Sequence, residues 1–475
     1  MQKILAPLAL AISLASGSAL GATLQDVAYA AWGNDHEWEV ARKTWLAAEE
    51  TKKQGFGGLL PQVTASYSHL RNEQRYEAFS GRPGGSPLRI KSELQTTRVN
   101  VVQPLFRMDT WYEYQRTKKV TSAAESNFDS ARQSFLLRVT EQYMNVLRTR
   151  EDLTSAQAEE RALARQLDQA NERYKVGLVP ITDVHEAQAA YDLSRVGLIV
   201  GESDFGIARD QLEALTGKRW DSLDSLQAEL PMSGPEPADP GTWVEQAQAN
   251  NPQVVTARSN ADAAKAVSKQ GVGAQMPSVD LVGQYQHEHT LKQDIDVAAL
   301  GGFGGLGLSN GTEGNYYGVQ VSMPLFAGGA LNSKRKQAAL NYQASEEQYK
   351  LVWRDIGQQT RSLHRVVEAN VLRVQAQRQA LVSAQSALKA TESGYSVGTR
   401  NIVDVVIAQR NLYSSQRDYA AARYTYIIDS LRLKAAAGIL SEEDLAEVNG
   451  WLDSSKPVKL YDEGGQDPAT NVSTR

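Results

Sequence analysis

The sequence predicts an internally duplicated α+β membrane protein, in which each half carries a β-hairpin and a very long helix. Residues 174–184 recur as residues 395–405, with a tyrosine, a glycine and an aspartate at matching places. A Pro-Leu-Phe run closes a strand-like segment in each half, at 104–106 and at 324–326. A repeat on this scale indicates that both halves carry the same elements in the same order.

The N-terminus has the features of a secretory signal peptide, which we place at residues 1–22. A lysine precedes an apolar run from Ile4 to Leu14, and small residues follow, with cleavage expected between Gly21 and Thr23. The apolar run is too short to span a bilayer as a retained helix.

The composition excludes several kinds of site and partner. The chain has no cysteine, which excludes disulfides, thiolate metal sites and a lipidated N-terminal cysteine. The formal net charge of −5 gives no indication of a nucleic-acid partner. Past the signal, no stretch has the length and apolarity of a transmembrane helix, so a membrane role would require strands.

We divide the mature chain into two repeats, residues 23–230 and 242–440, joined by a proline-rich linker at 231–241. Each repeat is expected to contain a helix, a β-hairpin, a long helix, a tight turn and a return helix. The final segment, residues 441–475, is expected to end in a disordered tail, because beyond about Val448 the chain is polar and without periodicity.

The hairpin strands alternate between apolar and polar residues. In the first strand Val63, Ala65 and Tyr67 share one face, and polar side chains share the other. The other strands place on their apolar faces Val99, Val101, Leu105, Val279, Leu281, Tyr285, Val319, Val321 and Leu325. This pattern is typical of a barrel strand with lipid on one side and water on the other. It equally fits a half-buried hairpin of a soluble protein.

After Phe106 the pattern is helical to about Tyr174, without proline or glycine. About 65 residues span roughly 100 Å as an α-helix, a length that favours a coiled coil or helical array. Apolar residues recur at coiled-coil spacing in both halves, as in Leu163-Leu167-Ala170-Tyr174 and Ala384-Leu388-Thr391-Tyr395. Gly177 and Gly398 lie where each long helix reverses, which predicts left-handed caps.

Four strands per chain cannot close a barrel. An open sheet edge in lipid would leave unpaired backbone groups that cost several kcal/mol each. Chains must therefore share their strands, so that two chains give eight and three chains give twelve.

These features together resemble the TolC family of outer-membrane channels, which serve drug efflux and type I secretion. The resemblance covers nearly the whole mature chain and is carried by Leu60-Pro61-Gln62, the two Pro-Leu-Phe runs, and residues 176–184 and 395–405. It implies a homotrimer with a twelve-stranded β-barrel, a helical coiled-coil barrel across the periplasm, and a mixed α/β equatorial belt built partly from the linker and the final segment. The missing cysteine places the chain with the unlipidated branch.

The same resemblance implies a passive exit duct in the cell outer membrane, with no enzymatic activity and no cofactor. Its implied partners are outer-membrane lipid, a periplasmic adaptor (membrane fusion) protein and an inner-membrane transporter of RND, ABC or MFS type. The alternative is a periplasmic structural coiled-coil or adaptor protein without a membrane barrel. An adaptor would carry one helical hairpin between small β-domains, whereas this chain has two copies with alternating strands.

The resemblance also implies a gate that holds the periplasmic end shut. The matching positions are Thr182, Asp183, Tyr395 and Arg400, with Asp404 in an acidic ring. A second acidic ring is expected three residues later, where this chain has Ile407. From the residues alone, Asp183 and Glu186 equally fit a capping box, and Asn401 fits a cap of the second return helix.

The turns resemble the family's docking loops for an adaptor. The residues concerned are Val176, Gly177, Leu178, Val397, Gly398 and Thr399. Their alternative is a helix cap with no partner. Trp111, Tyr112 and Tyr114 fit either an interfacial aromatic girdle or packing within the long helix. His287 and His289 share one face of a strand, but nothing nearby supplies the further ligands of a structural metal site, so no metal is expected.

Overall fold

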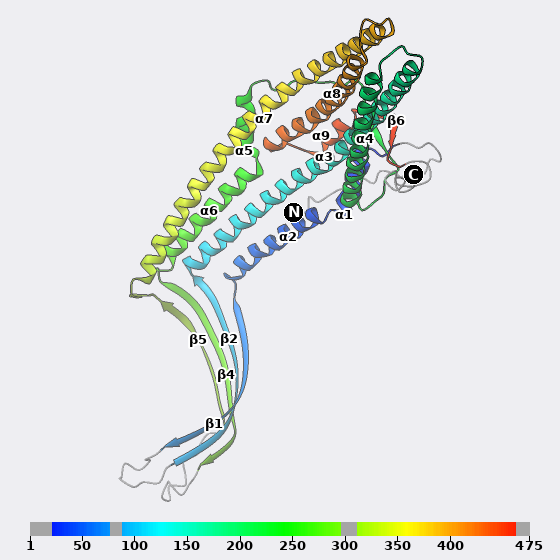
Figure 1. Cartoon of the computed structure of the whole chain (residues 1–475). Coiled ribbons are helices and arrows are strands. Elements are labelled where there is room, and N and C mark those ends of the chain that lie inside the picture. The colour runs from blue at the N-terminus through cyan, green and yellow to red at the C-terminus, as the bar shows by residue number, and fades with distance from the viewer. Residues whose placement is uncertain (1–20, 77–87, 296–310, 462–475) are drawn as a thin grey trace, which may run out of the picture. The chain divides into compact units, whose positions relative to one another are not determined.

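The computed structural model describes residues 21–76, 88–295 and 311–461 (Figure 1). The first half contains α1 (Leu24–Asn34), α2 (His36–Gly57), β1 (Gln62–Tyr76), β2 (Leu88–Phe106), α3 (Met108–Lys175), α4 (Ile181–Thr216) and β3 (Ser222–Leu226). The second half contains α5 (Pro240–Asn250), α6 (Pro252–Gly273), β4 (Ser278–Ile295), β5 (Gly311–Ser322), α7 (Ala330–Ser396), α8 (Ile402–Ala436), α9 (Glu442–Asn449) and β6 (Leu452–Lys459). Residues 1–20 of the predicted signal peptide and the two hairpin loops, residues 77–87 and 296–310, lie outside the described residues.

The two halves repeat the same order of elements, as predicted: a helical segment, two strands, a long helix and a return helix. The long helices α3 and α7 have 68 and 67 residues. Among the helices of the described residues, none is both long enough and apolar enough to cross a bilayer.

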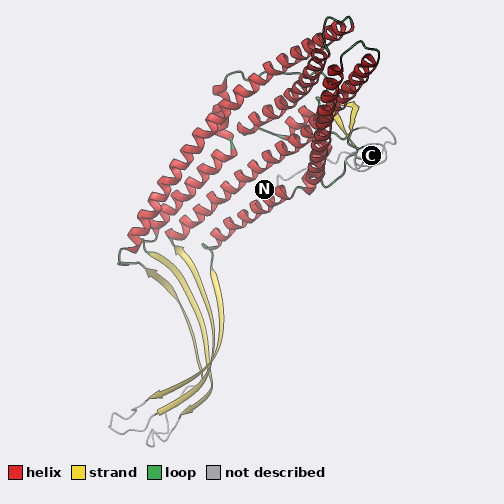
Figure 2. Ribbon diagram, in the orientation of Figure 1, coloured by secondary structure: helices red, strands yellow, loops and turns green. Residues whose placement is uncertain are grey.

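The four long strands form one antiparallel sheet in the order β1-β2-β4-β5 (Figure 2). The central pairing of β2 with β4 joins the two halves of the sequence, because Val101 lies opposite both Val63 in β1 and Gly283 in β4. Directly opposed residues point to the same side of a sheet. The predicted apolar residues Val63, Val101, Leu281 and Val319 therefore share one face, which confirms the alternation within the strands. The prediction for Leu325 is wrong, because β5 ends at Ser322.

The other face of the sheet carries hydrogen-bonded polar side chains. The guanidinium of Arg98 donates to the Gln286 side-chain oxygen at 3.0 and 3.2 Å, and Gln284 donates to the same oxygen at 3.0 Å. At the helical end of the sheet, Arg107 donates two hydrogen bonds of 2.7 and 2.8 Å to the buried carboxylate of Asp280. A polar face so connected is suited to water, and the apolar face to lipid.

The chain forms two compact units, each of which takes segments from both halves. Within the described residues, one unit comprises residues 21–42, 128–254 and 353–461, and the other comprises residues 43–76, 88–127, 255–295 and 311–352. The second unit holds the sheet and the helix ends next to it. The first holds the helical turns, the small elements α1, α5 and α9, and the β3–β6 sheet.

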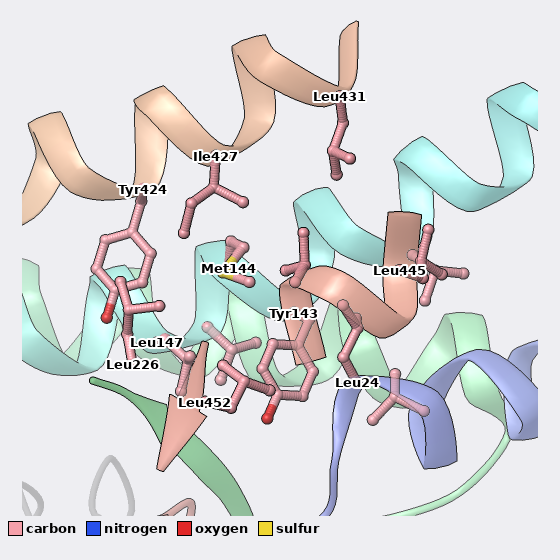
Figure 3. Packing of buried hydrophobic residues seen from close by; sticks show 14 of the residues in the cluster. Leu24, Tyr143, Met144, Leu147, Leu226, Tyr424, Ile427, Leu431, Leu445 and Leu452 are labelled. Carbon is pink, nitrogen blue, oxygen red and sulfur yellow. The ribbon is translucent and has the colours of Figure 1, made fainter. Parts of the chain in front are cut away.

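The main core lies in the first unit, where α3, α4 and α8 pack with α1, α9, β3 and β6 (Figure 3). Met144 of α3 lies near Ile427 of α8, and the Tyr143 ring of α3 lies near Leu452 of β6 (Figure 3). All four side chains are buried. Burying such side chains stabilises the fold by about 1.5–3 kcal/mol each.

The prediction that the chain is disordered beyond about Val448 is wrong for residues up to 461. Strand β6 pairs antiparallel with β3, with Leu452 opposite Leu226 and Val458 opposite Leu223. The segment has few apolar residues, but Leu452 and Leu460 are buried at its two ends. Two anchors separated by a polar run give no periodic signal in the sequence. Residues 462–475 lie outside the described part.

Candidate gate and docking tips

The two long helices end in the same turn. Gly177 has φ of +74° and Gly398 has φ of +80°, both in the left-handed region. In each turn the next residue, Leu178 or Thr399, donates its N–H to the carbonyl five residues earlier at 2.9 Å. These are the bonds of a Schellman cap, so the predicted glycine caps are confirmed.

The turns expose large apolar side chains. Val176, Leu178 and Val397 are 70, 74 and 75% exposed. A helix cap requires the glycine and its backbone bonds but no exposed apolar groups beside it. Apolar side chains clustered on a surface typically mark a site of interaction.

The return helices begin differently. In α8 the Asn401 side chain accepts a hydrogen bond from the Asp404 N–H at 2.8 Å, which confirms the predicted cap. In α4 the cap position is Pro180, and no side chain completes it. The alternative prediction of a capping box by Asp183 and Glu186 is therefore wrong. Asp183 is the third helical residue, where the helix dipole favours its charge but where it cannot act as the cap.

Tyr395 packs where the two helical hairpins meet. It belongs to a buried cluster with Ala170 of α3, Ala187 of α4, and Ile402 and Val405 of α8. Its ring lies under the Arg173 guanidinium, and its hydroxyl is buried without a hydrogen-bond partner among the described residues. A buried hydroxyl without a partner is costly, so this group is poised to accept or donate a bond.

Arg400 is 61% exposed at the start of α8, and its Nη1 lies 3.7 Å from Asp404 Oδ2. Within the described part of the chain it therefore pairs with Asp404 and not with Asp183. Thr182 is exposed on the first turn of α4. The structure thus gathers the predicted gate residues at one end of the helices but does not bond Tyr395 or Arg400 to α4.

A cleft of about 840 Å³ lies beside Tyr395, between α3 and the pair α7 and α8. The polar side chains that line it were not predicted from the sequence. Gln166 and Gln409 are buried, and Gln166 Nε2 and Gln409 Oε1 find no partner among the described residues. Glu392 also lines the cleft. The sequence does contain a feature that could have indicated these residues, namely a glutamine beside the apolar coiled-coil positions. Gln166 precedes Leu167, and Gln409 lies four residues after Val405.

The two predicted acidic-ring positions lie on α8. Asp404 is partly exposed and paired with Arg400, whereas Ile407 is exposed. Ile407 lines a second cleft with Val196 and Val200 of α4, both of which are exposed. An apolar surface therefore stands where the resemblance implied a second carboxylate.

The aromatic residues after β2 pack partly against other helices of the same unit. The Tyr114 ring lies 5.7 Å from Phe56 of α2, and Lys269 Nζ lies 5.9 Å from the Tyr112 ring centroid. Trp111 stays largely exposed. In the described ranges, no group of His, Asp and Glu residues is arranged to hold a metal ion.

Comparisons with known proteins give a consistent result. The sequence profile of the family described as outer membrane efflux protein matches residues 27–218 and 243–439. Outer membrane protein TolC of Escherichia coli strain K12 is 31% identical over 469 residues, which cover 98% of this chain and 91% of TolC. The proteases secretion protein PrtF of Dickeya chrysanthemi is 24% identical over 463 residues, 95% of this chain and 96% of PrtF. The crystal structure of the Campylobacter jejuni CmeC outer membrane channel shares the fold, with a TM-score of 0.72, 17% identity, and coverage of 94% of this chain and 95% of CmeC.

Proposed function

Since the chain belongs to the outer membrane efflux protein family and is an outer-membrane exit duct for efflux and type I secretion, we propose that it works passively, gated at its periplasmic end. It is a channel protein and not an enzyme. The energy for transport comes from the inner-membrane partner. The alternative prediction, a periplasmic structural coiled-coil or adaptor protein, is wrong, because the relatives are outer membrane proteins.

The assembly that we propose is a homotrimer with a shared twelve-stranded barrel. In the described sheet β1 and β5 are the outer strands, so each needs a partner strand from elsewhere. The apolar face would meet lipid, and the polar face with Arg98 and Gln286 would line the lumen. The exposed apolar residues of α4, Leu193, Val196 and Val200, support helix contacts between neighbouring chains.

The gate that we propose consists of Thr182, Asp183, Tyr395 and Arg400, bonded between the helical hairpins of one chain or of neighbouring chains. Two observations support this set. The Tyr395 hydroxyl is buried without a partner, and the Asp183 carboxylate is not used as a helix cap. A guanidinium such as that of Arg400 makes strong charge-assisted bonds with a carboxylate. Closing the gate would exchange its 3.7 Å contact with Asp404 for such a bond.

The single observation that carries the docking proposal is the pair of matching turns with exposed Val176, Leu178 and Val397. We propose that a periplasmic adaptor covers these side chains and brings a transporter of RND, ABC or MFS type to the tunnel end. The exposed area is apolar and rigid, because both turns are fixed by the same backbone bonds. A rigid surface loses little conformational freedom on binding.

The experiment replaces the exposed apolar groups and leaves the glycines in place. In a strain without its own duct, Val176→Asp with Leu178→Asp should abolish drug resistance and secretion while trimers still reach the outer membrane. The control is Tyr29→Asp, which changes an equally exposed aromatic residue of α1 and should leave transport unchanged. Full transport by the tip variant would mean that the turns are only helix caps.

A further inference from the structure

The first described residues of the chain are bonded to β3. Ala22 lies opposite Leu223 in a parallel bridge, in which the Ala22 N–H donates to the Ser222 carbonyl at 2.9 Å. The Ala22 carbonyl accepts from the Asp224 N–H at 3.1 Å and from the Tyr143 hydroxyl at 3.0 Å. The backbone of Ala22 is therefore held in place by three hydrogen bonds.

The side chain beside this bridge is a buried carboxylate without a cation. Asp224 is 3% exposed, and its Oδ1 has no hydrogen-bond partner among the described residues. Burial raises the pKa of Asp224, and the nearby charges of Asp26 on α1 and Asp453 on β6 raise it further. A buried charge in such surroundings is strongly unfavourable unless it is paired.

The residue that touches this carboxylate is Gly21. A Cβ placed on Gly21 would lie 2.5 Å from Asp224 Oδ1 and 2.6 Å from the Leu223 carbonyl carbon. The backbone of Gly21 thus occupies the space next to the carboxylate, and no larger residue fits there. Gly21 is also one of the two residues after which the sequence predicts cleavage of the signal peptide.

We propose that the signal peptide is removed between Gly21 and Ala22, and that the α-ammonium group formed on Ala22 pairs with the Asp224 carboxylate. In this step, which a signal peptidase catalyses, water breaks the Gly21–Ala22 amide bond. The hydroxyl of water goes to the Gly21 carbonyl carbon, and its hydrogen goes to the Ala22 nitrogen. That amine takes up a further proton from solvent near neutral pH, because an α-amino group has a pKa of about 7.7–8.0.

The sequence and the structure both favour this bond over the next one. A cut after Gly21 places small residues, Ala19 and Gly21, at the two positions that signal peptidases recognise. A cut after Ala22 would put Leu20 at the first of these positions. It would also remove Ala22 and with it all three of the backbone bonds to β3 and Tyr143.

Cleavage changes the surroundings of Asp224 in two ways. Gly21 leaves, so space opens beside Oδ1, and the nitrogen next to that space becomes a cation with three N–H donors. One N–H keeps the bond to Ser222, and another is free for the carboxylate. The pair forms only in the processed chain, so removal of the signal peptide stabilises the attachment of α1 to β3.

The first test is the intact mass of the protein extracted from outer membranes. The expected mass is that of a chain beginning at Ala22. The Gly21→Ala variant should give an identical mature mass and an identical thermal midpoint, because residue 21 is no longer present. A mature chain that begins at Gly21, at Thr23 or elsewhere would overturn the proposal.

The second test removes the charge of the Asp224 side chain while keeping its shape. Asp224→Asn in the mature protein should lower the thermal midpoint by several degrees, whereas Asp221→Asn, an exposed carboxylate three residues away, should leave it unchanged. An ammonium stabilised by pairing has a raised pKa in the folded state. Its contribution is complete below about pH 8, the unfolded value, and is lost as the pH rises through the folded value.

The advantage of wild type over Asp224→Asn should therefore shrink and then reverse at high pH, because the buried carboxylate that only the wild type carries is then unpaired. Burial raises the pKa of the Tyr143 phenol, so this neighbour stays neutral throughout that range. Equal midpoints for Asp224→Asn and Asp221→Asn, or a difference that does not change with pH, would overturn the ion pair. The inference requires export but not the duct function, since an inactive channel that begins at Ala22 would leave it intact.

Discussion

Arg173 of α3 lies with its guanidinium carbon 4.6 Å from the centroid of the Tyr395 ring in α7. This contact joins the long helices of the two halves one turn before their tips. It occupies the face of the ring and leaves the hydroxyl without a partner. A cation over an aromatic ring contributes about 0.5–1 kcal/mol or more. Tyr395 is thus held in place by its ring, and its hydroxyl remains available for the gate.

Removing the proposed gate bonds should open the channel without unfolding it. Arg400→Ser with Tyr395→Phe keeps the Arg173 contact and the apolar cluster. Exposed pairs contribute only about 0.2–1 kcal/mol each, but threefold symmetry multiplies the effect on a closed–open equilibrium. The expected result is a higher single-channel conductance in planar bilayers and cells sensitised to large antibiotics. Arg410→Ser, a charge-matched change on α8, should leave conductance unchanged. If the double variant conducts like wild type, these residues do not gate.

The identity of residue 407 should set how strongly cations block the channel. With Ile407 in place of a second acidic ring, block by trivalent cations is expected to be weak, and Asp404→Ala should weaken it further. Conversely, Ile407→Asp should strengthen the block at least tenfold, because two rings of three carboxylates one turn apart attract a multivalent cation more strongly than one. The measurement is the blocking concentration in planar bilayers. An unchanged value for Ile407→Asp would show that this position does not face the pore.

The fold was predictable where the sequence repeats itself. The alternation of Val63, Ala65 and Tyr67 and the glycines at 177 and 398 specify strands and turns locally, and the structure confirms them. Strand β6 was not predictable, because its order depends on a pairing with β3 more than two hundred residues away. Long-range pairings of short polar strands have no local signature.

The site was predictable only in part. Asn401 caps α8 as expected, but Pro180 displaces Asp183 from the cap of α4, because the helix starts directly after the proline. Gln166 and Gln409 were missed because their burial depends on how α3 packs against α7 and α8, which one sequence does not specify. The contact of Arg173 with Tyr395 is likewise a product of packing between the two halves.

The described part of the final segment, up to residue 461, should be needed for stability, whereas the tail that the sequence predicts to be disordered should not. The Arg209 and Arg219 guanidinium carbons lie 4.4 and 3.6 Å from the centroid of the Tyr461 ring, and the Tyr461 hydroxyl donates to Glu213. Truncation after residue 461 should leave the thermal midpoint unchanged. Truncation after residue 451 removes the buried Leu452 and Leu460, each worth about 1.5–3 kcal/mol, and should prevent stable trimers from forming. Normal trimers from the shorter chain would show that β6 is dispensable.

Glu151 of α3 should be more stabilising as a neutral side chain. It accepts a hydrogen bond from the Tyr424 hydroxyl at 2.8 Å, and burial raises its pKa, although Tyr424 and Arg423 oppose that shift. A carboxyl whose pKa is raised on folding favours the folded state most below its unfolded pKa, and this contribution is lost as the pH rises through the folded value. At pH 7 the ionised group therefore costs stability.

Glu151→Gln keeps the shape of the side chain and an oxygen that can accept from Tyr424. We expect it to stabilise the protein at pH 7 by on the order of 1 kcal/mol, read as a higher thermal midpoint. The gain should shrink as the pH falls and Glu151 itself becomes protonated, which its raised pKa makes easier. Glu186→Gln, an exposed carboxyl on α4, serves as the control and should change little at either pH. A lower midpoint for Glu151→Gln at pH 7 would mean that the ionised carboxylate, held by Arg423 and Tyr424, is the stabilising form.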